Sequence, residues 1–139
     1  MNIYFACSIT GGRELESVYE AFVATLSADG HEIPTAHLAL PGVMEEARLE
    51  PRMVYERDTA WIRGCDVLIA EVSVPSHGVG YEIGYALSAA KPALCLVQEG
   101  RKLSKMISGN PHLLLMVRSY ATTEAGLSLI REFLNQVIL

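Results

Sequence analysis

The sequence predicts an α/β protein. Short runs rich in Val, Ile and Leu alternate along the chain with longer segments of helical periodicity. These runs are apolar on both faces, as the strands of a parallel sheet covered by helices on two sides must be. A chain of 139 residues that is half hydrophobic fits one domain with a sizeable core. We therefore expect residues 1–139 to form a single flavodoxin-like or Rossmann-like three-layer sandwich around a five-stranded parallel sheet.

The first half of the chain predicts two strands and two helices. Apolar residues between Leu15 and Leu26 recur at helical spacing, and Gly30 ends that helix. Pro51 is suited to the first turn of the next helix, because its fixed φ is already helical. The expected elements are a strand over Asn2–Cys7, a helix from Leu15, a weaker strand over His31–Leu38, a loop over 39–50 and a helix from Pro51 to Gly64.

The second half predicts three strands and three helices. Val-Leu-Ile-Ala at the centre of the third strand marks it as a buried strand. The expected elements are strands over Asp66–Val72, Pro92–Val97 and His112–Val117, and helices over Gly80–Ala90, Leu103–Ser108 and Thr123–Val137.

Composition excludes several classes of protein. Eleven Lys and Arg against sixteen Asp and Glu give a net charge of −5, and no basic stripe marks a duplex nucleic-acid binder. The acidic composition still allows a small anionic ligand, because a few local donors can hold a phosphate. The N-terminus does not resemble a signal peptide, and no apolar stretch approaches the roughly 18 residues of a membrane helix. We expect a cytoplasmic protein that binds neither nucleic acid nor membrane.

Cysteine and histidine spacing argues against a metal centre. The three cysteines, Cys7, Cys65 and Cys95, lack CxxC spacing, and we expect reduced, mostly buried thiols. The four histidines form no HxxxH-type pair. No metal is expected.

Ligands of parallel α/β sheets bind beyond the carboxyl ends of the strands. The first strand is followed by Ser8-Ile9-Thr10-Gly11-Gly12-Arg13, which leads into a helix. The glycines allow close approach of the backbone, and the helix N-terminus and polar side chains offer donors to a phosphate or ribose. It is not a Walker loop, because the GKS/T ending is missing. Spacing alone leaves an ordinary capped turn equally open.

The third strand is followed by the densest polar segment, Ser73 to Gly84, in which Glu82 has apolar neighbours. A carboxylate in such surroundings usually has a function or a partner, and a helix N-terminus would help keep it ionised as a nucleophile or base. The alternative is a first-turn glutamate that only complements the helix dipole. The Ser/Gly lead-in and the position after a strand favour function.

The same segment approaches a dinucleotide-binding fingerprint. Gly78, Gly80 and Gly84 are spaced one residue too far apart, although Glu99 lies where a ribose-binding acid could sit. Glu82 would face the pyrophosphate with the wrong sign, and no room remains for a substrate domain. NAD binding is not expected. Taken singly, His37, Asp58 and Ser104 fit structural roles.

The motifs together resemble the 2′-deoxynucleoside 5′-monophosphate N-glycosidases, within the nucleoside 2-deoxyribosyltransferase superfamily. The likeness covers nearly the whole chain. Its most specific stretches are Ser-Ile-x-Gly-Gly-Arg from Ser8 and Ser-x-Gly-Val-Gly-Tyr-Glu-x-Gly from Ser76. Thr10 stands where relatives often have Arg, and Cys7 where they have Gly; both differences bear on phosphate affinity or base preference.

The resemblance implies hydrolysis of the N-glycosidic bond of a deoxynucleoside monophosphate, with no cofactor. Glu82 matches the nucleophile, Tyr4 and Asp58 line the reacting centre, and His37 lies near the nucleotide. The serine matched by Ser104 comes from the neighbouring subunit, which implies a homodimer. The groups around the sugar and 5′-phosphate match Ser8, Ile9, Thr10, Gly11, Gly12, Arg13, Ser76, Gly78 and Ser104.

Three other functions stay open from the sequence. A nucleoside 2-deoxyribosyltransferase would use the same nucleophile and pass the sugar to a second base. A ribonucleotide N-glycosidase acting on a monophosphate such as CMP is a close variant. A nucleotide-sensing module would bind without turnover, although Tyr4, Asp58 and Glu82 together speak against it.

Overall fold

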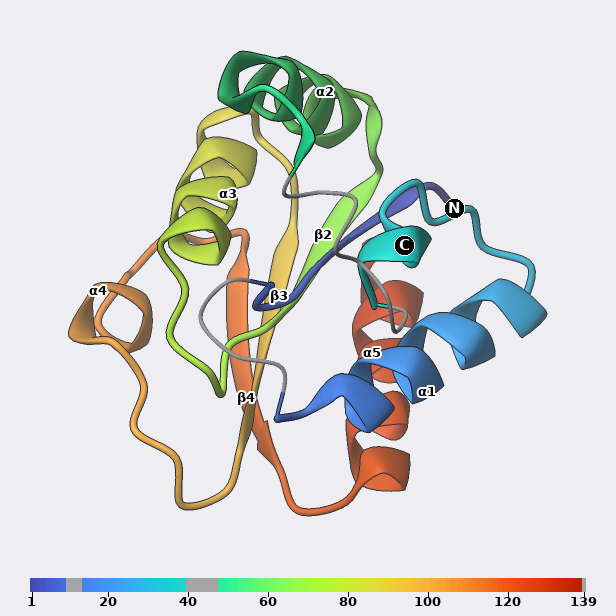
Figure 1. Cartoon of the computed structure of the whole chain (residues 1–139). Coiled ribbons are helices and arrows are strands. Elements are labelled where there is room, and N and C mark those ends of the chain that lie inside the picture. The colour runs from blue at the N-terminus through green and yellow to red at the C-terminus, as the bar shows by residue number, and fades with distance from the viewer. Residues whose placement is uncertain (10–13, 40–47, 139) are drawn as a thin grey trace.

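The computed structural model describes residues 1–9, 14–39 and 48–138. They contain one four-stranded sheet in which neighbouring strands are parallel and lie in sequence order (Figure 1). The strands are β1 (Ile3–Ala6), β2 (Val67–Glu71), β3 (Ala93–Gln98) and β4 (Leu115–Tyr120). The predicted parallel α/β architecture is confirmed.

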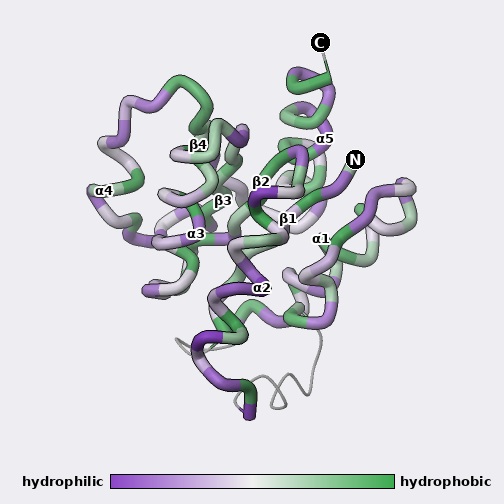
Figure 2. The backbone as a smooth tube through the Cα atoms, turned by 90° about the horizontal axis from the view of Figure 1, so that it is seen from above, coloured by the Kyte–Doolittle hydropathy of each residue, from purple (hydrophilic) through white to green (hydrophobic). Residues whose placement is uncertain are grey.

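Helices cover both faces of the sheet. One face packs against α1 (Glu16–Ala28) and α5 (Thr123–Ile138), and the other packs against α2 (Pro51–Gly64) and α3 (His77–Ser88) (Figure 1). The short α4 (Lys105–Ser108) adds Ile107 to the second face. Figure 2 shows α2 as largely hydrophilic, in keeping with only Thr59 and Ile62 being buried on it. No helix of the described ranges is long and apolar enough to cross a membrane.

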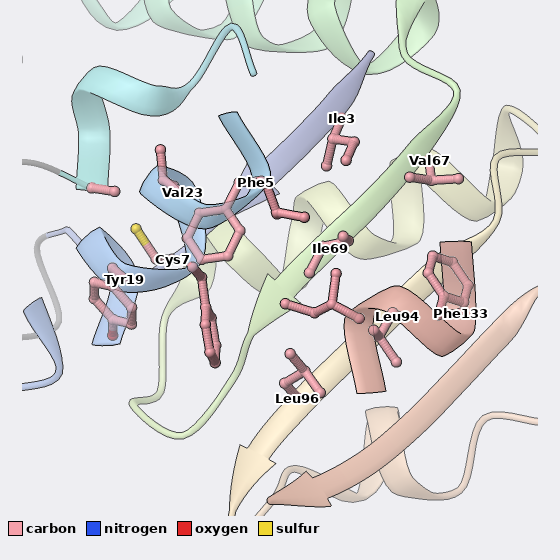
Figure 3. Packing of buried hydrophobic residues seen from close by; sticks show 14 of the residues in the cluster. Ile3, Phe5, Cys7, Tyr19, Val23, Val67, Ile69, Leu94, Leu96 and Phe133 are labelled. Carbon is pink, nitrogen blue, oxygen red and sulfur yellow. The ribbon is translucent and has the colours of Figure 1, made fainter. Parts of the chain in front are cut away.

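Alternation along the strands divides the core into two clusters. In β1, Ile3 and Phe5 face α1 and α5, while Tyr4 faces α2 and α3. Phe5 makes edge-to-face contacts with Tyr19 and Phe22 at 6.4 Å between ring centroids. Figure 3 shows this packing of β1 side chains against α1. The same alternation therefore turns Tyr4 toward the helices that carry Asp58 and Glu82.

The prediction of a strand over His31–Leu38 is wrong. Backbone pairing is limited to a bridge between Asn2 and Glu32, after which the chain turns into a 3₁₀ helix, η1 (Ala36–Ala39). Pro34 cannot donate to a ladder. The Thr35 hydroxyl replaces the next ladder bonds, accepting from the Phe5 N–H at 3.0 Å and donating to the Phe5 carbonyl at 2.8 Å.

Several element boundaries differ from prediction by two or three residues, and two of them have a clear local cause. Helix α3 begins at His77 rather than Gly80, because the Ser76 hydroxyl caps it by accepting from the Val79 N–H at 3.3 Å. Strand β4 begins at Leu115 rather than His112. The side chain of His112 accepts from the Leu114 N–H at 3.2 Å, so local turn bonds occupy this segment.

Gly126 allows α5 to lie close to α1. A Cβ at this position would meet Phe22 Cζ at 2.7 Å and Tyr120 Cδ2 at 3.3 Å. We expect Gly126→Ala to lower the free energy of unfolding by about 1–3 kcal/mol through overpacking. Gly84→Ala in α3 is the matched control, because nothing lies within 4 Å of its Cβ. Urea denaturation should show a stabilised control, by about 0.5–1 kcal/mol; equal effects at the two positions would contradict this packing.

Candidate active site

The candidate site lies between β1, α2 and α3. Tyr4 is a buried residue of β1, and Glu82 is a half-buried residue of α3. Asp58 is on α2, which packs against α3. Three elements that are far apart in sequence therefore bring together the three residues predicted to be catalytic.

The start of α3 places Glu82 beside Ser76 and Gly78. The spacing from Gly78 to Glu82 is one helical turn, so the two positions lie above one another. A Cβ on Gly78 would lie 3.6 Å from Glu82 Oε1 and 3.9 Å from the Ser76 hydroxyl oxygen. The carboxylate thus reaches back over the first turn toward the capping serine. The bare backbone of Gly78 leaves space between these two polar groups.

Tyr4 and Glu82 interact through their polar ends. The Tyr4 hydroxyl is buried without a hydrogen bond of standard geometry in the described part of the chain. Its pKa is nevertheless raised, first by burial and then by the charge and hydrogen-bonding influence of Glu82. We conclude that the hydroxyl is close to the carboxylate but imperfectly aligned with it. Tyr4 stays neutral at physiological pH and can donate to the ionised Glu82 carboxylate.

The Glu82 carboxyl group titrates far above a normal glutamate. Its pKa is raised to about 7, mainly by burial and in part by the charge of Asp58, against the lowering influence of the Tyr4 hydroxyl and the Arg57 charge. A carboxyl group poised near neutrality is typical of a catalytic acid, base or nucleophile. This environment argues against a glutamate that only complements the helix dipole.

Asp58 is held by its neighbour on α2. Arg57 Nε donates to Asp58 Oδ1 at 2.8 Å, and the two side chains are only 24% and 17% exposed. The expectation from the residue alone was a solvated or ion-paired side chain; the ion pair is present, and it is partly buried.

His37 reaches the same neighbourhood through Trp61. The two rings meet edge to face at 6.0 Å between centroids, and Trp61 is one helical turn after Asp58. His37 sits in η1, at the end of the segment predicted as the second strand. His37 therefore lies near the site, although the strand that was predicted to carry it is absent.

The first predicted loop is only partly described. Ser8 is fully buried directly after β1, and its hydroxyl has no hydrogen-bond partner within the ranges described. Ile9 is half-buried beside it. An orphaned buried hydroxyl at this edge of the sheet is consistent with a ligand-binding role. Thr10, Gly11, Gly12 and Arg13 lie outside the described residues.

Ser104 and Ser76 line a cleft of about 620 Å³ between α3 and the 102–110 segment. Ser104 is exposed and caps α4, accepting from the Met106 N–H at 3.2 Å. The cleft follows the face of α3 that carries Val79 and Ile83, and Glu82 is not among its lining residues. Ser76, which lines the cleft, also lies near the Glu82 carboxylate across Gly78. Within one chain, the structure does not bring Ser104 to Glu82.

Sequence reasoning missed two features of the structure, one beside Asp58 in the site and one on the opposite face of the sheet. One is the Arg57–Trp61 pair, which the helical spacing of i and i+4 around Asp58 could have indicated. The other is Glu71, a fully buried carboxyl group that accepts from the Ser73 N–H at 2.6 Å and from the Tyr120 hydroxyl. Its pKa is raised by burial. By alternation along β2, Glu71 faces α1 and α5. Its hydrogen bond with Tyr120 connects the carboxyl ends of β2 and β4 on the face of the sheet opposite Glu82.

The three cysteines are buried thiols, as predicted. Within residues 1–9, 14–39 and 48–138, no three His, Cys, Asp or Glu side chains gather so as to hold a metal ion. The chemistry available in the described site is that of a carboxylate, a neutral phenol and an Asp–Arg pair.

The fold and the site together define a Rossmann-like α/β protein with a half-buried carboxyl group of raised pKa on α3. Its family follows from the sequence comparison. The chain belongs to the nucleoside 2-deoxyribosyltransferase family, whose model matches residues 3–129.

Individual relatives carry more specific names. The 5-hydroxymethyl-dUMP N-hydrolase of Mus musculus is 44% identical over 119 residues, which are 78% of this chain and 65% of that protein. The 5-hydroxymethyl-dUMP N-hydrolase of Tetraodon nigroviridis is 38% identical over 142 residues, covering 98% and 99% of the two chains.

Solved structures agree on the fold. The Clostridium botulinum CMP N-glycosidase BcmB superposes with a TM-score of 0.69 at 21% identity, over 94% of this chain and 99% of that one. The solution structure of BlsM gives a TM-score of 0.80 at 21% identity, over 99% and 91%. At this identity the likeness supports the Rossmann-like architecture alone.

Proposed function

We propose that this protein hydrolyses the N-glycosidic bond of 2′-deoxynucleoside 5′-monophosphates to the free base and 2-deoxyribose 5-phosphate. The observation that carries the proposal is the Glu82 carboxyl group, half-buried, beside Tyr4 and Asp58, with a pKa of about 7. The names of the 5-hydroxymethyl-dUMP N-hydrolases support this reaction class and substrate class.

In the first step, a Glu82 carboxylate oxygen bonds to C1′ while the bond from C1′ to the base nitrogen breaks. The electron pair leaves with the base, which takes up a proton. Positive charge builds up at C1′ in the transition state, and a carboxylate in a partly dry site stabilises it strongly. The Tyr4 hydroxyl orients Glu82. Asp58 faces the ring or the leaving base and either delivers the proton or positions the base.

In the second step, water forms a new bond to C1′ and the ester bond from C1′ to Glu82 breaks. The carboxylate is regenerated, and the proton lost by the water passes to solvent through a basic group of the site. The product is 2-deoxyribose 5-phosphate. The absence of a 2′-hydroxyl eases formation of the positively charged sugar, which favours deoxy substrates.

Phosphate recognition falls to the polar groups near the start of α3 and after β1. Gly78 lies one turn before Glu82, Ser76 caps the same helix, and Ser8 keeps a buried hydroxyl available at the end of β1. A helix N-terminus attracts a phosphate. Ile9, Thr10, Gly11, Gly12, Arg13 and His37 complete the proposed set of binding residues.

A homodimer forms part of the proposal. Ser104 is exposed and does not reach Glu82 within its own chain. A second copy would bring Ser104 to the neighbouring site. In analytical ultracentrifugation, wild type and Ser104→Ala should both be dimeric. In equilibrium binding, Ser104→Ala should have lower affinity for the nucleotide than wild type. A monomeric wild type would contradict the dimer.

The reaction is tested by a panel of deoxynucleotides and ribonucleotides assayed for liberated base. Release of base and 2-deoxyribose 5-phosphate from a deoxynucleoside monophosphate supports the proposal. Adding a second free base tests sugar transfer, since a new nucleotide in place of the free sugar phosphate would identify a transferase. Preference for CMP would identify a ribonucleotide hydrolase. Tight binding with no base release would identify a sensing module.

A further inference from the structure

Arg57 is held in one place by two different contacts on α2. Its Nε donates to Asp58 Oδ1 at 2.8 Å, and its guanidinium carbon lies 4.8 Å from the centroid of the Trp61 ring. A planar guanidinium can donate in its plane while it stacks on an aromatic face, which an ammonium group cannot do. The two contacts together hold the guanidinium between the Asp58 carboxylate and the Trp61 ring.

The ion pair of Arg57 is much less exposed than that of Arg52 on the same helix. Arg52 Nε bonds Glu56 Oε1 at 2.7 Å, but those side chains are 88% and 58% exposed. Such a surface pair contributes little and is screened by salt. The Arg57–Asp58 pair is 24% and 17% exposed, so its charges are screened far less.

The charges near Glu82 come from two elements. Tyr4 approaches from β1, while Asp58 and Arg57 approach from α2. Tyr4 is neutral, so Asp58 and an ionised Glu82 place two negative charges in one partly buried site. Of the residues that the structure describes, Arg57 is the cation whose charge acts on both Tyr4 and Glu82. Without it, ionisation of Glu82 would meet the negative charge of Asp58 with less compensation.

We propose that Arg57 is a positioning residue of this site, which holds the Asp58 carboxylate in place and offsets the negative charge shared by Asp58 and Glu82. The proposal rests on the proposed function in assigning Glu82 as the group that must be ionised to attack. Arg57 touches Asp58 and Trp61, so it acts through its neighbours.

The two roles give separable results. Arg57→Gln removes both the charge and the contact of the guanidinium with Trp61. We expect Glu82 to ionise at higher pH, so that the rising limb of kcat/KM against pH moves to higher pH. Each unit of such a shift corresponds to as much as a tenfold loss below the pKa. The loss should be large near about pH 6 and shrink toward about pH 9, where Glu82 ionises in both proteins.

Arg57→Lys keeps the charge and loses the planar guanidinium. We expect its rising limb to stay near that of the wild type while kcat falls severalfold at every pH, because Asp58 is no longer oriented. Arg52→Gln is the matched control, and its profile should coincide with the wild type. Urea midpoints for all variants establish that each is folded. If Arg57→Gln does not fold, the kcat of Arg57→Lys still tests the positioning role.

The experiment has a readout that does not need turnover. Titration of the Glu82 side-chain carbon by ¹³C NMR in the ligand-free protein should show a higher pKa in Arg57→Gln than in wild type and Arg52→Gln. A wild type that releases no base would sink the proposed function, while this titration would still test the charge role of Arg57. Coincident Glu82 titrations in Arg57→Gln and Arg52→Gln overturn the charge role. A wild-type kcat in Arg57→Lys overturns the positioning role.

Discussion

Glu82→Gln is expected to reduce base release from a deoxynucleoside monophosphate by about 10⁴-fold or more, the scale seen when a covalent nucleophile is lost. Glutamine keeps the shape of the side chain but cannot form the bond to C1′ or neutralise the positive charge there. Substrate affinity should change little, because the proposed phosphate contacts are made by serine hydroxyls and backbone donors and not by the Glu82 carboxylate. Steady-state kinetics of base release check the rate, and equilibrium binding of the nucleotide checks the site.

The stability of Glu82→Gln at different pH values tests whether Glu82 has a structural role. The pKa of Glu82 is about 7 in the folded protein, against 4.5 for a glutamate in an unfolded chain. A raised folded-state pKa stabilises the protein at low pH, and that contribution is lost as pH rises from about 4.5 through about 7. Glu82→Gln should therefore be more stable than wild type at about pH 8. An inactive but destabilised variant would argue for a structural role of Glu82.

Removal of the 5′-phosphate from the substrate is expected to cost about 10²-fold or more in kcat/KM. Two charge-assisted hydrogen bonds at about 1.5–3 kcal/mol each account for this loss. Binding energy from the phosphate, remote from the reacting bond, holds C1′ against Glu82. The comparison of a deoxynucleoside with its monophosphate measures the effect directly.

A variant locates the phosphate contact. Ser76→Ala should weaken turnover of the monophosphate and leave the slow turnover of the nucleoside nearly unchanged. Ser88→Ala on the same helix is a suitable control, because Ser88 donates only to the Tyr85 carbonyl at 2.7 Å, on the exposed end of α3. Equal turnover of nucleoside and monophosphate by the wild type would contradict the assignment and favour a transferase that acts on nucleosides.

Much of the architecture could be predicted from local patterns. Apolar runs on both faces identified the four strands that are present, and Gly30 and Pro51 correctly marked the end and the start of helices. The segment from His31 to Leu38 has the composition of an edge strand. Its pairing is lost because Pro34 lacks a donor and Thr35 satisfies β1 with its side chain, which is a tertiary effect.

The candidate site was less accessible to sequence reasoning. Glu82 could be singled out from its apolar surroundings and its place after a strand. Tyr4 and Asp58 have no distinguishing local context, and only the family resemblance connected them to Glu82. Arg57 is identified by its contacts with Asp58 and Trp61, and Trp61 by its contact with His37. The contact between Trp61 and His37 depends on the packing of η1 against α2, which the sequence does not reveal.

Trapping of the sugar on the enzyme tests the central claim most directly. Rapid acid quenching of the protein during turnover, followed by mass mapping of its peptides, should find 2-deoxyribose 5-phosphate attached to the peptide that carries Glu82. Glu82→Gln treated in the same way should carry no adduct. An adduct on any other residue, or continued base release by Glu82→Gln, would contradict the account.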